Sequence, residues 1–538
     1  MDPNYREDFG DAAVKPPSRN DTLLFWACFM SIVATAFGFV VRTQIIDDWG
    51  RQFNLNETQK GDIFGVGLWP FSISIVLFSL IIDKIGYGTA MAFAFLCHVG
   101  SAILTIMTPQ LAGGDPEKAF WLLYAGTFIV ALGNGTVEAV ANPVVANLFP
   151  REKTKYLNML HAGWPGGLVL GGLIALSMGS FDWRYKVALL FLPAVGYAVL
   201  MLGRKFPVSE RVTAGVSFKS MCREVGVLGA ALIVGLIVRQ LGTVFAWPDM
   251  IQLAIWAVLT IAYGAYVGFA PGQPMFLFLM IIMIPLATTE LGTDSWMSSL
   301  MEPAMQEGLG ISGAWVLVYT SLIMLILRFF AGPIVHKLSP LGLLSVSAAI
   351  AAIGLFSLSK ASGLSILAAA TLYGFGKSFF WPTMLGVAAE QFPKGGALTL
   401  NTLGGVGMLA VGVLGAPFLG SIQDSKTDID LLAREPALHA QVIDNTPKFS
   451  VFGKYKALDT KKVDALPAEP KKLVNEIKDG ARKNALAVVS ILPCIMLVCY
   501  LILIGYFRTK GGYKPQILIS EKEEALLMTG GAVGPADL

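Results

Sequence analysis

The feature that most constrains this chain is a series of apolar runs, each long enough to cross a bilayer. A transmembrane helix needs about 20 consecutive, mostly apolar residues. Backbone amides find no water in hydrocarbon, so such runs have to pair their own N–H and C=O groups and form helices. The runs lie near residues 22–42, 61–82, 88–108, 119–148, 156–178, 186–203, 227–245, 250–269, 274–300, 313–335, 341–359, 363–388, 396–420 and 484–507. The sequence therefore predicts an all-α integral membrane protein with 14 transmembrane helices.

The composition agrees with a membrane protein and argues against other classes. Hydrophobic residues make up 54% of the 538 residues and charged residues only 14%, whereas soluble domains carry about 25% charged residues. The formal net charge of +3 does not indicate a nucleic-acid partner. The five cysteines show neither metal-ligand spacing nor a disulfide framework. The sequence also shows no phosphate loop and no nucleophile–base pair, so we expect no enzyme activity, no cofactor and no bound metal.

Lysine and arginine in the short loops predict the orientation of the helices. If the N-terminus is cytoplasmic, the cytoplasmic segments carry more Lys and Arg than the short outer loops, as the positive-inside rule requires. We therefore expect a multi-pass protein of the cell (inner or plasma) membrane with both termini in the cytoplasm. The long polar insertion at 421–483 would face outward. It is either a mobile surface loop or small helical hairpin, or a lid or partner-binding element.

The two halves of the chain contain the same short motifs in the same order. A Gly-x-Gly motif, a Phe-Pro pair and a Leu-Asn pair begin at Gly133, Phe149 and Leu157, and again at Gly374, Phe392 and Leu400. The copies are separated by nearly the same number of residues. Asp47-Asp48-Trp49 matches Asp294-Ser295-Trp296 at a similar spacing. Two parallel six-helix halves are an architecture of secondary transporters, which hold the substrate between the halves near the bilayer midplane.

This repeat divides the chain into five predicted parts. They are a cytoplasmic N-tail (1–21), an N-terminal six-helix half (22–203), a cytoplasmic loop with an extra helix pair (204–270), a C-terminal six-helix half that contains the insertion (271–508), and a cytoplasmic C-tail (509–538).

The motifs resemble a known family of transporters. The segment GNGTVEAVANPVVANLFPREKTKYLNMLHAGWPGG (133–167) resembles the fourth and fifth helices of the fucose permease family of the major facilitator superfamily. TTELGTDSW (288–296) and SFFWPTM (378–384) resemble its seventh and tenth helices. IIDKIGYG (81–88) is similar to the superfamily's loop between helices two and three. The resemblance implies two six-helix bundles with an extra helix pair between them, and transport by alternating access.

Glu138 is the first candidate for a functional role. An ionisable group inside a membrane helix costs at least about 2.5–3.5 kcal/mol, so this carboxyl in the middle of an apolar run needs a reason. A buried carboxyl can take up and release a proton near neutral pH, and the resemblance implies that the matching glutamate is the proton-linked site. The alternative is a structural carboxylate paired to an arginine or a backbone amide.

Several other polar or aromatic residues are expected to contact the substrate. They are Asn142, Asn158, His161, Glu290 and Trp381. Asn142 shares a helix face with Glu138, and Glu290 could also hold sodium, since carboxylates bind hard cations. For each there is a structural alternative: Asn142 can brace the helix before Pro143, His161 can be a satisfied buried histidine, and Trp381 can be packing.

The basic residues in the apolar runs suggest a second substrate class. An Arg fork binds carboxylate groups at two points, so Arg42 and Lys377 together could hold an anionic substrate. The alternative for Arg42 is a residue at the membrane interface that extends toward water. Asp83 and Lys84 are expected to form a gate on the cytoplasmic side, and Arg328 is expected to belong to the same gate network.

The leading prediction is a proton-coupled symporter of a sugar or a related small polar solute. The alternatives are an organic-anion transporter and a membrane receptor without flux. The expected partners are a small-molecule substrate, a proton or sodium ion, and the lipid bilayer, with no nucleic acid.

Overall fold

The computed structural model of this chain describes residues 17–55, 57–179, 181–444, 448–450, 453–516 and 518. Most of the predicted N-tail and C-tail lies outside these residues. Eleven described helices are long and apolar enough to cross a membrane, or up to twelve if the bent pair α15–α16 is one span, by length and composition alone. The prediction of an all-α membrane fold is confirmed. The predicted count of 14 helices is consistent with the structure but is not confirmed, because two of the predicted runs are broken into shorter helices.

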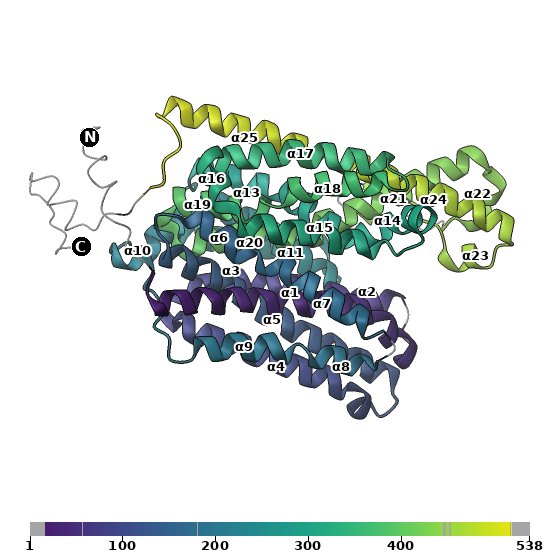
Figure 1. Cartoon of the computed structure of the whole chain (residues 1–538), viewed down its shortest axis with the longest axis horizontal. Coiled ribbons are helices and arrows are strands. Elements are labelled where there is room, and N and C mark those ends of the chain that lie inside the picture. The colour runs from purple at the N-terminus through teal and green to yellow at the C-terminus, as the bar shows by residue number, and fades with distance from the viewer. Residues whose placement is uncertain are drawn as a thin grey trace, which may run out of the picture.

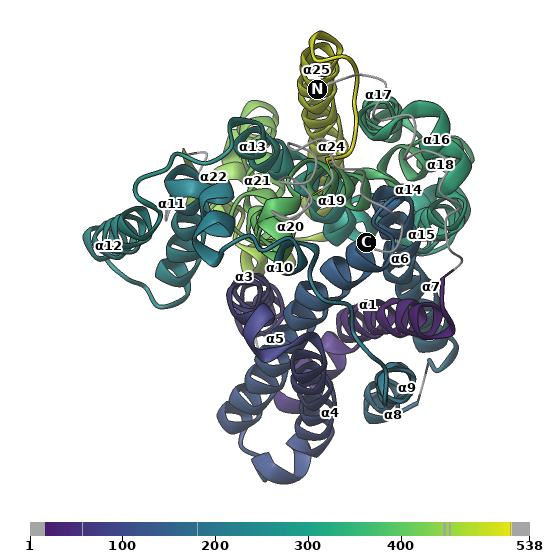
Figure 2. The same ribbon diagram turned by 90° about the vertical axis from the view of Figure 1, so that its left-hand side faces the viewer.

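The helices of the first 203 residues form one group, most of which lies in the lower part of the end-on view of Figure 2, while α6 packs against α19 of the other group. The helices of the first group are α1 (Arg19–Phe53), α2 (Glu57–Gly65), α3 (Trp69–Ile85), α4 (Tyr87–Ala112), α5 (Pro116–Leu148), α6 (Lys153–His161), α7 (Gly163–Ser177), α8 (Trp183–Ala188) and α9 (Phe191–Met201). Three helices follow before residue 270, and these are α10 (Glu210–Thr213), α11 (Phe218–Val244) and α12 (Asp249–Val267). The pair α11–α12 stands at the side of the molecule, where α11 packs on α20.

The helices after residue 270 make up the other group. They are α13 (Pro274–Ala287), η2 (Thr288–Gly292), α14 (Thr293–Leu309), α15 (Ala314–Phe329), α16 (Ala331–Leu338), α17 (Pro340–Lys360), α18 (Ser365–Lys377), α19 (Phe380–Gln391), η3 (Pro393–Gly395), α20 (Gly396–Ala410), η4 (Val411–Gly415), α21 (Ala416–Arg434), α22 (Pro436–Val442), α23 (Thr460–Asp464), α24 (Ala468–Val489) and α25 (Ile491–Thr509). Their long axes run roughly along the molecule's longest dimension (Figure 1).

The polar insertion has its own small core. Helices α21 and α24 pack together at the right-hand end of Figure 1, beside α22 and α23 and a two-stranded antiparallel sheet of β1 (Lys448–Ser450) and β2 (Gly453–Tyr455). Its buried apolar side chains are Leu431, Val442, Val463, Leu466, Val474 and Ile477. Of the forms expected from the sequence, the insertion is therefore a helical hairpin with additions. It lies at the opposite end of the molecule from α10 (Figure 1).

Several helices are interrupted near the middle of the bundle, and these interruptions position the site described below. Pro143 lies inside α5, and it cannot donate the backbone hydrogen bond that a helix interior requires. The α6–α7 and α18–α19 breaks are each followed by a proline, Pro165 and Pro382 respectively. The segments η2 and η4 are π-helical turns and contact each other. Such turns are rare and frequent at functional sites.

Candidate functional site

Three predicted residues form a hydrogen-bonded chain inside the first group of helices. Asn142 Nδ2 donates to Glu138 Oε2 at 2.7 Å, one turn away on α5. The ring nitrogen Nε2 of His161, at the end of α6, lies 2.8 Å from Asn142 Oδ1 and 3.9 Å from Glu138 Oε2. At most 5% of the surface of each of these residues is exposed. The structure therefore brings Glu138, Asn142 and His161 together in a dry environment.

Arg328 on α15 continues this chain into the second group of helices. Its Nη1 donates to the His161 carbonyl at 2.9 Å, its Nη2 donates to Glu290 Oε1 at 2.7 Å, and its Nε donates to the Ser378 carbonyl at 2.6 Å. The side chain is fully buried. From the sequence we expect Arg328 in the cytoplasmic gate network, whereas the structure places it at the junction between the two groups.

The backbone explains why Arg328 finds two carbonyls there. In a helix, the carbonyl of residue i accepts from the N–H of residue i+4. Pro165 follows His161 by four residues, and Pro382 follows Ser378 by four residues. Since proline has no N–H, both carbonyls lack a helical donor. Arg328 supplies the missing donors and so joins one broken helix from each group.

Glu290 uses its second carboxylate oxygen at another helix break. Oε2 accepts from the backbone N–H of Trp381 at 3.1 Å. Trp381 stands in the first turn of α19, where backbone N–H groups have no partner inside the helix. Glu290 itself lies in the π-helical turn η2. Both of its oxygens are thus occupied in this conformation, one by Arg328 and one by α19.

A second buried ion pair lies one turn further along. Lys377 Nζ contacts Asp294 Oδ1 on α14, and the same ammonium group stands 4.9 Å from the centre of the Tyr373 ring. Tyr373 Oη donates to the Thr289 carbonyl at 2.8 Å. Lys377 is fully buried, so its charge is compensated by Asp294 and the aromatic face.

Asn158 crosses between the two groups of helices. Its Nδ2 donates to the Thr154 carbonyl at 2.8 Å and to Thr383 Oγ1 on α19 at 3.1 Å. Trp381, on the same helix as Thr383, is 6% exposed. Both predicted substrate contacts therefore lie at the junction of α6 and α19, where they also serve packing.

Lys377 is the last residue of α18, whereas Arg42 lies on the first helix of the chain. Arg42 is half-buried on α1. A Cβ built on Gly67 would come within 2.8 Å of its Nη1, so the absence of a side chain at Gly67 makes room for the guanidinium. The described residues provide no hydrogen bond or ion pair to Arg42. The expected pairing of Arg42 and Lys377 around one anion stays a prediction, and Lys377 is already paired with Asp294.

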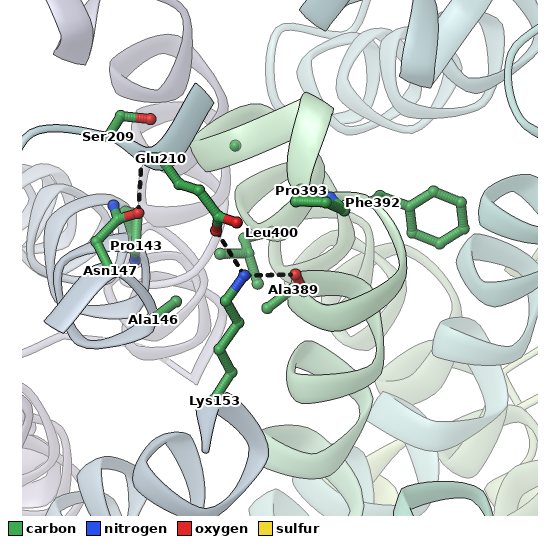
Figure 3. Close-up of a pocket in the computed structure, with 11 residues that line it drawn as sticks. Pro143, Ala146, Asn147, Lys153, Ser209, Glu210, Ala389, Phe392, Pro393 and Leu400 are labelled. Carbon is green, nitrogen blue, oxygen red and sulfur yellow. Dashed lines mark hydrogen bonds and ion pairs between the residues drawn. The ribbon is translucent and has the colours of Figure 1, made fainter. Parts of the chain in front are cut away.

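The end of the molecule at which α10 lies is closed by contacts between the two groups, and we call it the α10 end. Lys153 Nζ donates to Glu210 Oε2 at 2.7 Å and to the Ala389 carbonyl at 3.3 Å, and the Glu210 N–H donates to Asn147 Oδ1 at 3.0 Å. Figure 3 shows these side chains around a small pocket, with Pro393 on its far side. Helix α10, which we call the wedge, is thus hydrogen-bonded to α5 and α6 of one group and contacts η3 of the other.

Three further contacts belong to the α10 end. Asp83 forms an ion pair with Arg211 of α10. Lys84 is exposed, with its ammonium 5.9 Å from the centre of the Phe218 ring. Glu390 Oε1 accepts from Thr154 Oγ1 at 2.5 Å and from the Thr154 N–H at 3.2 Å. The predicted gate residues Asp83 and Lys84 therefore lie at this end, and Arg328 does not.

Sequence reasoning missed several residues of these networks. They are Asp83's partner Arg211, the wedge residue Glu210, the cross-contact residues Thr383 and Glu390, and Asn401. For Asn401 a signal existed, because Leu400-Asn401 is the second copy of Leu157-Asn158. The others reveal themselves only once the neighbouring helices are known.

The chain resembles known transporters in sequence profile and in fold. The Major Facilitator Superfamily model matches residues 23–416. No curated protein sequence matches the chain. A structure of the proton:xylose symporter XylE bound to 6-bromo-6-deoxy-D-glucose superposes with a TM-score of 0.60 at 14% identity, covering 94% of this chain and 98% of that one.

Two other solved structures have the same fold. The human organic anion transporter MFSD10 (TETRAN) gives a TM-score of 0.55 at 13% identity and covers 90% of this chain and 100% of its own. The transporter FucP in the outward conformation gives 0.52 at 15% identity, with coverages of 89% and 99%. At such identities the likeness shows a shared fold. Because the family model spans most of the sequence, the chain belongs to the Major Facilitator Superfamily and is a multi-pass membrane transport protein rather than an enzyme.

Proposed function

We propose that this chain is a proton-coupled symporter of a sugar or a related small polar solute, in which Glu138 carries the proton. The observation that carries the proposal is the buried chain from Glu138 through Asn142 and His161 to Arg328 and Glu290. It links a carboxyl of one helix group to an ion pair of the other. XylE, a proton:xylose symporter, has the same fold.

The charges around this chain support Glu138 as the proton carrier. Arg328 is paired with Glu290, and Lys377 with Asp294. Within the described residues, Glu138 has no Lys or Arg at ion-pair distance, and its nearest basic group is His161 at 3.9 Å. A buried, unpaired carboxylate is costly in a membrane. Uptake of a proton removes that cost, so the protonation of Glu138 and the conformation of its surroundings are coupled.

The arrangement also supports binding of a hydroxylated substrate. Amide and imidazole groups both donate and accept hydrogen bonds, and Asn142 and His161 stand beside the proposed proton site. A substrate hydroxyl that replaces the Asn142–His161 bond would alter the surroundings of Glu138 and the Arg328 contact in one step. Rocking of the two halves around this level would then move substrate and proton together, as alternating access requires.

Glu138→Gln tests the proposal, because it keeps the shape and removes the proton equilibrium. In proteoliposomes to which radiolabelled sugars are added outside, one at a time, we expect uphill uptake driven by a pH gradient to disappear while exchange of labelled for unlabelled sugar persists. Glu117→Gln, an exposed carboxyl on the same helix, should keep both activities. Full uphill uptake by Glu138→Gln would contradict the assignment.

An organic-anion substrate is the second candidate, and the position of Arg42 favours it. Its guanidinium has no hydrogen-bond or ion-pair partner among the described residues, and a transporter of organic anions, MFSD10, shares the fold. Under this alternative Arg42→Gln abolishes thermal stabilisation by carboxylates, whereas stabilisation by a neutral sugar changes little. Lys377 favours the sugar hypothesis instead, because Asp294 already compensates its charge.

The remaining predictions concern the domain division, the cellular location, the membrane orientation and the coupling ion. We propose the five-part division of the chain, a cell-membrane location and a cytoplasmic position for both termini, which would make the α10 end cytoplasmic. Under that orientation the structure is closed toward the cytoplasm, and the insertion faces outward. A proton or sodium ion would be the coupling partner.

A further inference from the structure

Asn401 on α20 contacts α5 beside Glu138 and lies outside the residues proposed to bind the proton and the substrate. Its Nδ2 donates to the Ala139 carbonyl of α5 at 3.1 Å, and the side chain is 1% exposed. The contact runs from the second group of helices to the first. Ala139 is the residue directly after Glu138, and Asn142 lies less than one turn further along.

The Ala139 carbonyl needs this donor because of Pro143. Four residues separate them, so Pro143 occupies the position whose N–H would close the helical hydrogen bond to Ala139. Proline has no N–H, and an unsatisfied carbonyl in a dry membrane interior is costly. Asn401 supplies the missing donor from another helix, as Arg328 does for the carbonyls freed by Pro165 and Pro382.

The contact with the Ala139 carbonyl determines how the Asn401 amide is oriented, because the amide oxygen has no competing hydrogen bond among the described residues. Asn401 Oδ1 is buried and has no hydrogen-bond partner among the described residues. The bond to Ala139 is thus the one that holds the Asn401 amide in place. In return, it fixes the turn of α5 that carries Glu138 and Asn142.

The location of Asn401 makes the contact sensitive to opening. It lies five residues into α20, about 8 Å along the axis from Gly396, which lines the pocket at the α10 end. Separation of the two helix groups at that end would pull Asn401 from Ala139. Water entering the opened end would then satisfy the carbonyl, so the donor matters in the closed conformation.

We propose that Asn401 is a positioning residue that couples the turn carrying Glu138 to closure of the α10 end, through the carbonyl that Pro143 leaves free. This inference rests on the proposed role of Glu138 for its link to protons. Its link to closure stands on the hydrogen bond alone. Loss of the Asn401 donor destabilises the closed conformation, because the Ala139 carbonyl is then buried without a hydrogen-bond partner.

A double-mutant cycle tests this with the full-length protein in nanodiscs. Ile85→Cys and Leu338→Cys place spin labels on exposed positions of α3 and α16, in a background carrying Cys494→Ser and Cys499→Ser. Asn401→Leu should raise the population with a longer label distance at least about fivefold. Pro143→Ala restores the N–H of residue 143, so Asn401→Leu added to Pro143→Ala should change that population less than twofold.

The same distances measured from pH 5 to pH 8 separate this proposal from the proposed function. If Asn401 positions Glu138, Asn401→Leu shifts the pH midpoint of the distance change, and Pro143→Ala reverses the shift. Suppose that no variant shows any pH dependence but the double-mutant cycle gives the expected populations. The proposed proton role of Glu138 is then wrong, and the closure role of Asn401 is supported. Equal effects of Asn401→Leu with and without Pro143 would overturn the proposal. Asn401→Ser, which keeps a shorter donor, replaces Asn401→Leu if that variant does not fold.

Discussion

Two pairs of buried, oppositely charged side chains, Glu290–Arg328 and Asp294–Lys377, limit which residues of this transporter can be changed singly. Glu290 and Arg328 are both fully buried, and each satisfies backbone groups of broken helices in addition to the other's charge. Removing one member of a buried pair leaves the other uncompensated, which is more damaging than replacing both.

We therefore predict that Glu290→Gln lowers the free energy of unfolding by about 3–5 kcal/mol. The cost arises from the isolated Arg328 guanidinium, since the neighbouring carboxylate Asp294 is already paired with Lys377. Thermal unfolding followed by tryptophan fluorescence in detergent measures the change, with Glu117→Gln as a neutral control. Glu290→Gln combined with Arg328→Met should recover part of the loss. A single variant as stable as the parent would show that the pair contributes nothing.

At this scale the sequence indicates which residues are unusual but not which groups they contact. Asn142 was expected on the same face as Glu138, and the two side chains are hydrogen-bonded. Arg328 was expected at a gate, yet its partners are carbonyls freed by Pro165 and Pro382. Those prolines are visible in the sequence. Their proximity to α15 depends on how distant helices pack, which one sequence does not specify.

Whole elements were easier to predict, because hydrocarbon leaves a chain few choices. Each predicted apolar run contains helix, since backbone groups in a bilayer have to pair internally. The interruptions were not predicted. A π-helical turn such as η2 or a break such as α18–α19 costs little when another helix supplies a donor or acceptor, and that partner is a tertiary feature.

The insertion is the element whose form the sequence left open, and it can be tested on its own. We predict that Val474→Asp, which puts a charge into the core formed by Leu431, Val442 and Ile477, unfolds the insertion and leaves the bundle folded. Hydrogen exchange should speed up at least tenfold across residues 421–483 while α5 and α20 keep their protection. Lys472→Asp, on the same helix but exposed, is the matched control. Unchanged hydrogen exchange in the insertion would show that this apolar core does not stabilise its fold.

On the scale of the whole molecule, the two helix groups contact each other in two regions, and different kinds of side chain make the contacts in each region. Farther from the α10 end the contacts are made by Arg328, Asn158 and Asn401, and two of these side chains serve carbonyls that prolines leave free. At the α10 end they are made by the wedge α10 and by Glu390. A rocking motion has to break the contacts at that end before it disturbs the contacts farther away. The α10 end therefore holds the conformation in which the proposed site is assembled.

The chain after α25 adds a further contact to this end. Tyr513 Oη donates to Glu390 Oε2 at 2.8 Å, and the Gln516 N–H donates to the Glu390 carbonyl at 2.7 Å. Burial, together with the Glu390 carboxylate, raises the pKa of Tyr513 above its usual range. The hydroxyl thus keeps its proton and donates throughout the physiological pH range. Since Glu390 also holds Thr154, this segment fastens the same carboxylate that joins α6 to α19.

We predict that Tyr513→Phe weakens closure without changing its pH dependence. One hydrogen bond to a charged group contributes about 1.5–3 kcal/mol, so the population open at the α10 end should rise by roughly tenfold or more in the spin-label measurement. Because the Tyr513 hydroxyl stays protonated, the increase should be the same at pH 5 and pH 8, in contrast to the pH shift expected for Asn401→Leu. Tyr506→Phe, which changes an exposed tyrosine of α25, should have no effect. An unchanged open population in Tyr513→Phe would mean that the wedge and Thr154 close this end without help from the C-terminal segment.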